Sequence, residues 1–350
     1  MKNVLILNLK LNIIVLLLLS FAACSPVRYM GIETYNPSGI TFPREVKSVL
    51  IVNNAVPQPE VPFESTMQSK RDSVHISADS AFFDFCRTLG LEIAASPYFE
   101  DVRLLEEGYR KDKYFFTDRM LSTNDVSLLC EEHDVDAIVS LDQLMFRIRE
   151  SAWKSSEFDF EGWMEIDVTG VIRAYLPERN TPLTSILISD TISPQLGYDI
   201  LDVASVLVYP EIMLRETAKA VAEKSSVNFV PYWSNDVRWY YVSSNAQWKE
   251  AAASATLDRW EQAYDKWKAV YDKTPESSWQ SKSRLASNMA LSKELTGDFA
   301  KALYWATESY RLLQGKLKES DRNFTLQKLY IDVLKHRILA DKRLHNQIDE

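Results

Sequence analysis

The sequence predicts an α/β (α+β) amino-terminal domain with a mixed sheet, followed by an all-α domain of repeated helices. In the first half of the chain, apolar runs rich in β-branched residues alternate with segments of helical period. A stretch of period two follows near residue 160, and paired helical patterns repeat toward the carboxy terminus. The length of 350 residues is enough for two domains of about 150 residues each.

The amino terminus has the pattern of a lipoprotein signal peptide, residues 1–23. Two lysines accompany an apolar run that is shorter than the ~20 residues of a membrane-spanning helix. The segment 21–24, Phe-Ala-Ala-Cys, resembles the bacterial lipobox. This resemblance implies acylation of Cys24 and a membrane anchor made by its acyl chains. The alternative is ordinary cleavage after Ala23, which leaves Cys24 as a free thiol.

The residues that follow Cys24 indicate an address in the cell envelope. Ser25 stands where an Asp would resemble an inner-membrane retention signal, so we expect the outer membrane. The segment 25–28 lacks the acidic run of many surface-exported lipoproteins of Bacteroidota, which favours the periplasm-facing leaflet. Residues 27–43 hold two Pro and two Gly without a clear period. We therefore expect residues 24–43 to be a tether between the lipid and the folded body.

The charge balance and the cysteines exclude two classes of protein. Asp and Glu number 49 against 40 Lys and Arg, and no basic block is present, which argues against nucleic-acid binding. Three cysteines are too few for a disulfide framework. Cys86 and Cys130 fall on the apolar faces of two expected helices. They either form a disulfide in an oxidising compartment or stay as buried, unreactive thiols.

The first domain, residues 44–225, is expected to begin with alternating strands and helices. Its first elements are strand 46–54, helix 80–98, strand 101–106, a helix that starts after Ser122, and strand 136–141. Residues 157–168 then alternate acidic and apolar side chains, which predicts an antiparallel strand with one solvated face. Residues 183–192 are expected to pair with that strand, and a helix over 203–224 to close the domain.

Three segments of this domain resemble the superfamily of the TolB amino-terminal domain, LpoB and CsgG. They are the opening strand Val46–Asn53, the segment Tyr98–Val102 after the first helix, and the segment His133–Val139. The resemblance implies an α/β domain of an envelope protein. It also implies a function in assembly and protein contact, not in catalysis.

The last part of the chain, residues 246–350, resembles tetratricopeptide repeats. Gly297–Ala302 matches the Gly-Asp-aromatic-x-x-Ala hallmark, and a second helix with Trp260 matches an earlier unit. The pattern predicts two helix pairs and a capping helix, with small residues where helices cross. The expected repeat-core residues are Trp248, Trp260, Ala263, Trp267, Phe299, Ala302 and Ala306.

The junction between the domains, residues 226–245, is rich in aromatic residues. Its candidate binding residues are Trp233, Arg238, Trp239, Tyr240 and Tyr241. They either present a platform for a peptide or sugar, or join the two domains through buried aromatic surface. With the lipobox and the Trp-rich helices, the junction makes the chain resemble an uncharacterised family of Bacteroidota lipoproteins with tetratricopeptide-like carboxy termini. That resemblance implies an architecture and an address.

No catalytic, metal or cofactor site is predicted. The sequence has no phosphate loop, nucleophile elbow or zinc-protease motif, and no His has a Cys or His at ligand spacing. The acids of the period-two strand, Glu157, Asp159, Glu161, Glu165 and Asp167, either form a solvated face or share a Ca²⁺ ion. We expect the solvated face.

The leading hypothesis is a non-enzymatic, lipid-anchored scaffold or assembly factor that binds another envelope protein and has no nucleic-acid partner. Helical repeats bind peptides or partner helices in concave grooves. One alternative is an oligomeric secretion or pore-assembly subunit, with 157–176 and 183–192 as a membrane hairpin. Another is a protein that binds or hydrolyses envelope polysaccharide through an acid pair.

Overall fold

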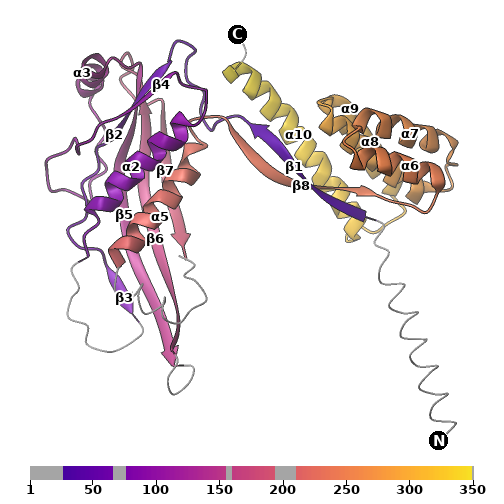
Figure 1. The fold of residues 1–350 in the computed structure, drawn as a ribbon, viewed down its shortest axis with the longest axis horizontal. Helices are drawn as coiled ribbons and strands as arrows, with labels where there is room; N and C mark the ends of the chain where they lie inside the picture. The colour runs from indigo at the N-terminus through magenta and orange to yellow at the C-terminus, as the bar shows by residue number, and fades with distance from the viewer. Residues whose placement is uncertain (1–26, 66–75, 155–159, 194–209, 349–350) are drawn as a thin grey trace, which may run out of the picture. The chain divides into compact units, whose positions relative to one another are not determined.

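The computed structural model describes residues 27–65, 76–154, 160–193 and 210–348. It divides into two compact units. The helical unit contains the described residues up to Asn36 together with Trp233–His345, and the sheet unit contains Pro37–Tyr232 with the last few residues. The predicted fold class is confirmed, because an amino-terminal α/β region with a mixed sheet precedes a run of helices (Figure 1). The expected signal peptide and Cys24 lie outside the described residues.

The sheet of the sheet unit mixes parallel and antiparallel pairs. Its strand order is β4-β2-β5-β6-β7, and β3 pairs with β5. Strands β2, β3, β4 and β5 pair in parallel, whereas β5, β6 and β7 form an antiparallel meander. The strands are β2 Ser48–Asn53, β3 Phe63–Ser65, β4 Asp101–Leu104, β5 Ala137–Lys154, β6 Phe160–Tyr175 and β7 Thr184–Ile192.

Helices cover both faces of this sheet. Helices α2 (Asp79–Ala94) and α5 (Pro210–Ser226) pack together over one face, where they enclose the larger core (Figure 1). Helix α3 (Thr123–His133) encloses a smaller core that includes Leu50 and Ile138. The predicted start of α3 is confirmed, since Ser122 forms a capping box with Asp125. The expected closing helix is α5, and residues 203–209 of the expected range lie outside the described part.

The strand predicted from the period of two is present as β6, and its apolar face packs into the hydrophobic core. Met164, Ile166 and Val168 are buried among the residues that α2 and α5 cover. Buried apolar side chains on one face explain the period of two in the sequence. In the described part of β6, this face therefore packs inside the protein and is not available to contact lipid as a membrane hairpin would.

The helical unit has five helices in its described residues. They are α6 Ala246–Thr256, α7 Trp260–Lys273, α8 Trp279–Leu295, α9 Phe299–Leu313 and α10 Arg322–Ile348. Consecutive helices from α6 to α9 pack on one another. The expected Gly-Asp turn lies between α8 and α9. Gly297 has a φ of +81°, which favours glycine, and the Asp298 carboxylate accepts a hydrogen bond from the Lys301 N–H at 3.1 Å to cap α9.

The expected tether and junction form strands instead. Strand β1 (Val27–Asn36) lies within the expected tether 24–43, and β8 (Tyr232–Tyr241) lies within the junction 226–245. The two pair as a two-stranded ribbon and run in opposite directions (Figure 1). Sequence patterns missed β1 because Glu33 and Thr34 interrupt its apolar residues and its partner is about 200 residues away along the chain. The helical unit is therefore not purely α.

The two described cysteines do not form a disulfide. Cys86 belongs to the core under α2 and α5, whereas Cys130 belongs to the core under α3. Burial raises the pKa of both thiols, that of Cys130 to about 11, so both are in their unreactive protonated form at neutral pH. The structure supports the second interpretation of these cysteines, in which both are buried, unreactive thiols.

No helix in the described ranges is both long enough and apolar enough to cross a membrane.

Candidate functional site

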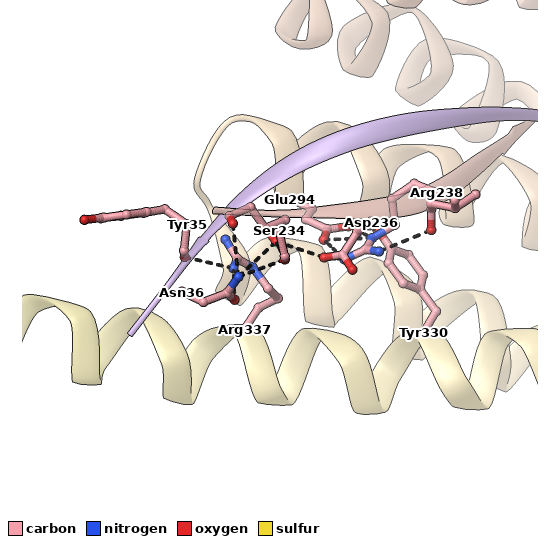
Figure 2. Close-up of polar contacts among 10 residues, drawn as sticks. Tyr35, Asn36, Ser234, Asp236, Arg238, Glu294, Tyr330 and Arg337 are labelled. Atoms are coloured by element: carbon pink, nitrogen blue, oxygen red, sulfur yellow. Dashed lines mark hydrogen bonds and ion pairs between the residues drawn. The ribbon is translucent and has the colours of Figure 1, made fainter. Parts of the chain in front are cut away.

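The predicted binding residues meet the helices in a buried ion pair. The Arg238 guanidinium, on β8, donates to both carboxylate oxygens of Glu294, on α8, at 2.8–3.1 Å (Figure 2). The Tyr330 hydroxyl, on α10, donates to the same carboxylate at 2.7 Å. All three side chains are buried. Burial opposes the charge of Arg238, but the hydrogen bonds to Glu294 hold its pKa above the usual value.

A second contact holds the backbone of β8. The Tyr241 N–H donates to Asn288 Oδ1 at 2.7 Å, and Asn288 Nδ2 donates to the Tyr241 carbonyl oxygen at 2.8 Å. The Trp248 indole N–H donates to the same carbonyl at 2.8 Å. We call these contacts of Asn288 and Trp248 with Tyr241 the backbone clamp. All of them bind the main chain of Tyr241, so they hold β8 without hydrogen bonds to its side chain.

The remaining aromatic residues of β8 differ in exposure. Tyr240 is buried, with its ring 6.1 Å from that of Trp267, and Trp239 lies 5.5 Å from the ring of Tyr330. Trp233 is 66% exposed. Four of the five candidate binding residues therefore attach β8 to helices of its own unit. The attachment is within the helical unit, whereas the sequence had suggested either a ligand platform or a joint between domains.

The far end of the ribbon is fixed by polar contacts between its two strands and by a contact from α10. The Thr34 hydroxyl donates to Asp236 at 2.9 Å, and the Asn36 amide donates to the Ser234 hydroxyl at 2.9 Å. Arg337 donates to the Tyr35 carbonyl oxygen at 3.2 Å (Figure 2). The inward face of the ribbon is thus occupied by the unit itself.

The expected repeat-core residues are nearly all buried in the core of the helical unit. One of them differs, because Phe299 is only partly buried. The Arg337 guanidinium lies over the Phe299 ring, with its Cζ atom 5.2 Å from the ring centroid. The buried ones are Trp248, Trp260, Ala263, Trp267, Ala302 and Ala306.

Sequence patterns missed a buried polar cluster in the sheet unit. Asp142 is the extra residue at a register shift between β5 and β6, and its side chain is buried. Asn54 and Ser140 donate to one oxygen of this carboxylate at 2.9 and 2.6 Å, and Arg173 and Tyr175 donate to the other at 2.7 Å. The only available signal was an acid directly after the apolar run 136–141.

The cluster fixes a loop that presents apolar side chains to solvent. Arg173 also binds Asp118 at 2.6 Å, and Asn54 donates to the Arg119 carbonyl oxygen at 2.8 Å. The side chain of Arg110 is buried and donates to the carbonyl oxygens of residues 114 and 117. We call residues 110–120 the aromatic loop. Its exposed apolar side chains are Tyr114, Phe116 and Met120, of which Phe116 is 72% exposed.

A groove of about 490 Å³ lies beside the aromatic loop on the sheet. Apolar and charged side chains from the loop and from β5, β6 and β7 line it. They include Phe115, Phe116, Met145, Arg147, Thr169 and Asp190. The loop and the groove together form an apolar surface with polar groups at its edge, which is typical of protein interfaces.

The two described acids of the acidic strand face, Glu165 and Asp167, pair with one arginine of a neighbouring strand. Arg149, on β5, binds Asp167 at 2.7 Å and Glu165 at 2.9 Å, and the Thr191 hydroxyl donates to Asp167 at 2.8 Å. The hydrogen bond from Arg149 lowers the pKa of Asp167. Glu157 and Asp159 lie outside the described residues, and nothing is said of the Glu161 side chain. Among the described residues, no group of three or more His, Cys, Asp and Glu is placed to hold a metal ion.

Two family models match this chain. One, described as a domain of unknown function (DUF8603), matches residues 46–241, which is more than half of the chain. The other, described as a domain of unknown function (DUF6340), matches residues 249–336. No curated protein matches the sequence.

The solved structures that match are distant. A PelC dodecamer from Paraburkholderia phytofirmans is 12% identical, with a TM-score of 0.25 over 57% of this chain and 98% of its own. A minor lipoprotein from Acinetobacter baumannii is 10% identical, with a TM-score of 0.23 over 53% and 97%. The hypothetical protein CT253 from Chlamydia trachomatis is 9% identical, with a TM-score of 0.25 over 52% and 96%.

Proposed function

The chain belongs to the family described as a domain of unknown function (DUF8603), and we propose that it is a non-enzymatic, lipid-anchored envelope protein that binds another envelope protein. Acyl chains on Cys24 anchor it to the periplasm-facing leaflet of the outer membrane. The sheet unit then acts as the binding domain, as the resemblance to the TolB amino-terminal, LpoB and CsgG superfamily implies. The helical unit is a tetratricopeptide-like scaffold of the kind implied for Bacteroidota lipoproteins.

The aromatic loop is the observation that carries this proposal. Tyr114, Phe116 and Met120 expose large apolar surface within seven residues, on a backbone fixed by Arg110 and Arg173. Exposed apolar residues of this kind mark binding surfaces, and aromatic and Met side chains are enriched there. A fixed loop loses little conformational entropy on binding, which favours a specific partner.

The helical groove is a less suitable site for the partner. In tetratricopeptide-like arrays the inner helices face a concave surface that takes up peptides. Here the inward residues of α8 bind the chain's own β8, through Glu294 with Arg238 and Asn288 with Tyr241. An incoming peptide would first have to displace β8. The partner surface therefore belongs to the sheet unit in this proposal.

A photo-crosslinking experiment in cells tests the binding surface. A benzophenone amino acid replaces Phe116 in the full-length protein, and the matched control carries it at Leu187, which is exposed on β7 of the same unit. We expect crosslinks to one envelope protein from position 116 and not from 187. Equal products at both positions, or none at 116, would overturn the assignment of the loop.

The same experiment separates the alternative of an oligomeric assembly subunit. Crosslinks from position 116 to a second copy of this chain would support that alternative. The anchor is tested separately by metabolic labelling with an alkyne fatty acid. We expect label on the wild type and none on Cys24→Ser. An unlabelled wild type would show that the protein is not a lipoprotein.

A further inference from the structure

We propose that the outward face of the β1–β8 ribbon lies on the phospholipid headgroups as a membrane-contact surface. This inference rests on the proposed acylation of Cys24. It assigns a partner, a lipid surface, to the face of the ribbon on which Tyr29, Trp233 and Val237 are exposed, while α10 contacts that face at Trp239 and Tyr29. The face is defined by Tyr29, Tyr35, Trp233 and Val237.

The alternation of the two strands separates this face from the inward one. Ile32 and Thr34 of β1 are buried, and Arg238 of β8 is buried against α8. Residues at the alternate positions point the other way, since side chains alternate along a strand. On that side Trp233 and Val237 are 66% and 65% exposed, and Tyr29 is 58% exposed.

The aromatic residues extend along the ribbon. The Tyr35 and Trp233 rings lie 4.8 Å apart at one end, and Tyr29 lies toward the other end. Tyr35 follows Tyr29 by six positions along the strand, a length of about 20 Å. Apolar side chains at both ends of one face suit a ribbon that lies flat on a surface.

The distance from the anchor brings this face to the membrane. Strand β1 begins at Val27, three residues after Cys24. A fully extended chain spans at most about 3.6 Å per residue, so Val27 lies within about 11 Å of the acylated residue. With a tether of 20 residues the fold would be free to leave the bilayer. With three residues, the start of β1 is confined to the headgroup region.

The side chains of this face suit an interface between water and hydrocarbon. Tyr and Trp are enriched at that depth because their rings are apolar and carry one polar group. Arg322, an exposed residue of α10, donates to the Tyr29 hydroxyl at 3.2 Å. Its positive charge complements lipid phosphates. Glu33 and Asn235, the exposed Glu and Asn of the face, lie among the polar headgroups.

A fluorophore placed in the centre of the face tests the proposal. In the full-length protein, Asn235→Cys carries an NBD label, and the matched control carries it at Tyr304→Cys, an exposed site on α9. The described native thiols, Cys86 and Cys130, are buried and do not compete for the label. Each protein is reconstituted in vesicles of phosphatidylethanolamine and phosphatidylglycerol, with and without doxyl-labelled lipid.

We expect the label at position 235 to shift to shorter emission wavelengths on the vesicles and to lose emission when doxyl lipid is present. The label at position 304 should do neither. A double variant, Trp233→Ser with Val237→Ser, should reduce the quenching at 235 without changing the fold, because both side chains are exposed. Equal behaviour at 235 and 304 would overturn the proposal.

The failure of this proposal is distinguishable from failure of the anchor. The mass of the mature amino-terminal peptide reports acylation of Cys24 independently of the label. An acylated, vesicle-bound protein with no quenching at 235 keeps the anchor and overturns the ribbon contact. If the protein is not acylated, the Cys24→Ser variant is labelled at position 235 and added to vesicles, and quenching supports the ribbon contact whereas its absence overturns it.

Discussion

Both units bury a carboxylate beside an arginine, and the two sites differ in how many partners the carboxylate has. In the sheet unit, Asp142 accepts hydrogen bonds from four residues. In the helical unit, described residues that donate to Glu294 are Arg238 and Tyr330. A buried charge is costly unless it is paired and hydrogen-bonded. When one donor is lost, the Asp142 carboxylate therefore keeps three hydrogen-bonding residues. The Glu294 carboxylate keeps only the Tyr330 hydroxyl as a described donor when Arg238 is lost.

The positions of the two sites explain this difference. The Asp142 cluster lies where strands of one sheet and an adjoining loop converge, so neighbouring strands supply several donors. The Glu294 site joins a strand to helices distant along the chain, and each element supplies one side chain. In long-range attachments of this kind, a few residues make most of the contribution to the free energy of unfolding.

The largest effect is expected from Arg238→Met. The variant leaves the buried Glu294 carboxylate with the Tyr330 hydroxyl as its described donor. We expect the free energy of unfolding to fall by about 3–5 kcal/mol, measured by urea denaturation with Trp fluorescence. The double variant Arg238→Met with Glu294→Leu should regain much of that loss. A loss below about 1 kcal/mol, as in an exposed pair, would contradict a desolvated site.

A smaller effect is expected from Arg173→Met in the sheet unit. Asp142 keeps the hydrogen bonds from Asn54, Ser140 and Tyr175, so the expected loss is about 1–3 kcal/mol. Release of Asp118 should also speed proteolysis within the aromatic loop. Arg119→Met is the matched control, because its side chain is exposed. A loss equal to that of Arg238→Met would remove the proposed difference between the units.

The backbone clamp is tested by Asn288→Leu. Two hydrogen bonds to Tyr241 are lost while the Trp248 contact remains, so we expect a loss of about 1–2 kcal/mol. Hydrogen exchange of the Tyr241 amide should become faster. Asn235→Ala, an exposed change in the same strand, should alter neither quantity. Unchanged exchange at Tyr241 in the Asn288 variant would show that the clamp does not hold β8.

The smallest effect is a pH dependence of the sheet unit. Burial raises the pKa of Asp136, but the N–H groups of Lys47 and Ser48 hydrogen-bond its carboxylate and leave the pKa lowered overall. A lowered folded pKa stabilises the protein above the unfolded value of about 3.9, and this contribution is lost as the pH falls through the folded pKa.

Asp136→Asn should therefore be less stable than wild type at pH 7, and the difference should shrink below about pH 4. Urea midpoints measured from pH 7 to pH 3 give the comparison. A difference that stays constant over this range would mean that the contribution does not come from the charge of Asp136.

Local patterns predicted the sheet unit well. The apolar run before Asn54, the capping sequence at Ser122 and the alternation around Ile166 each describe a single element. The bulge at Asp142 was not predictable, because one extra residue in a strand leaves the hydrophobic pattern almost unchanged. Arg173 and Asn54, which hold the aromatic loop, come together only in the folded sheet, so the candidate site of this unit was missed.

In the helical unit the sequence located the right residues and assigned them the wrong setting. Trp239, Tyr240 and Tyr241 were recognised as a cluster, and their contacts with α6, α7, α8 and α10 were not. The aromatic composition of this segment indicated that its large apolar side chains had to be buried against another element. Which element covers it is decided by pairing between β1 and β8, segments that are far apart along the chain.

The sequence by itself determined the order and kind of most elements, because hydrophobic period and capping are local properties of a chain. It also contains the segment 21–24, which resembles a lipobox. Only the tertiary structure decided that residues 27–36 form a strand, that β8 packs against α8, and that Arg173 and Asn54 connect the aromatic loop to Asp142. These arrangements depend on side chains that meet across long sequence separations, where burial makes each charge and each backbone N–H group find a partner.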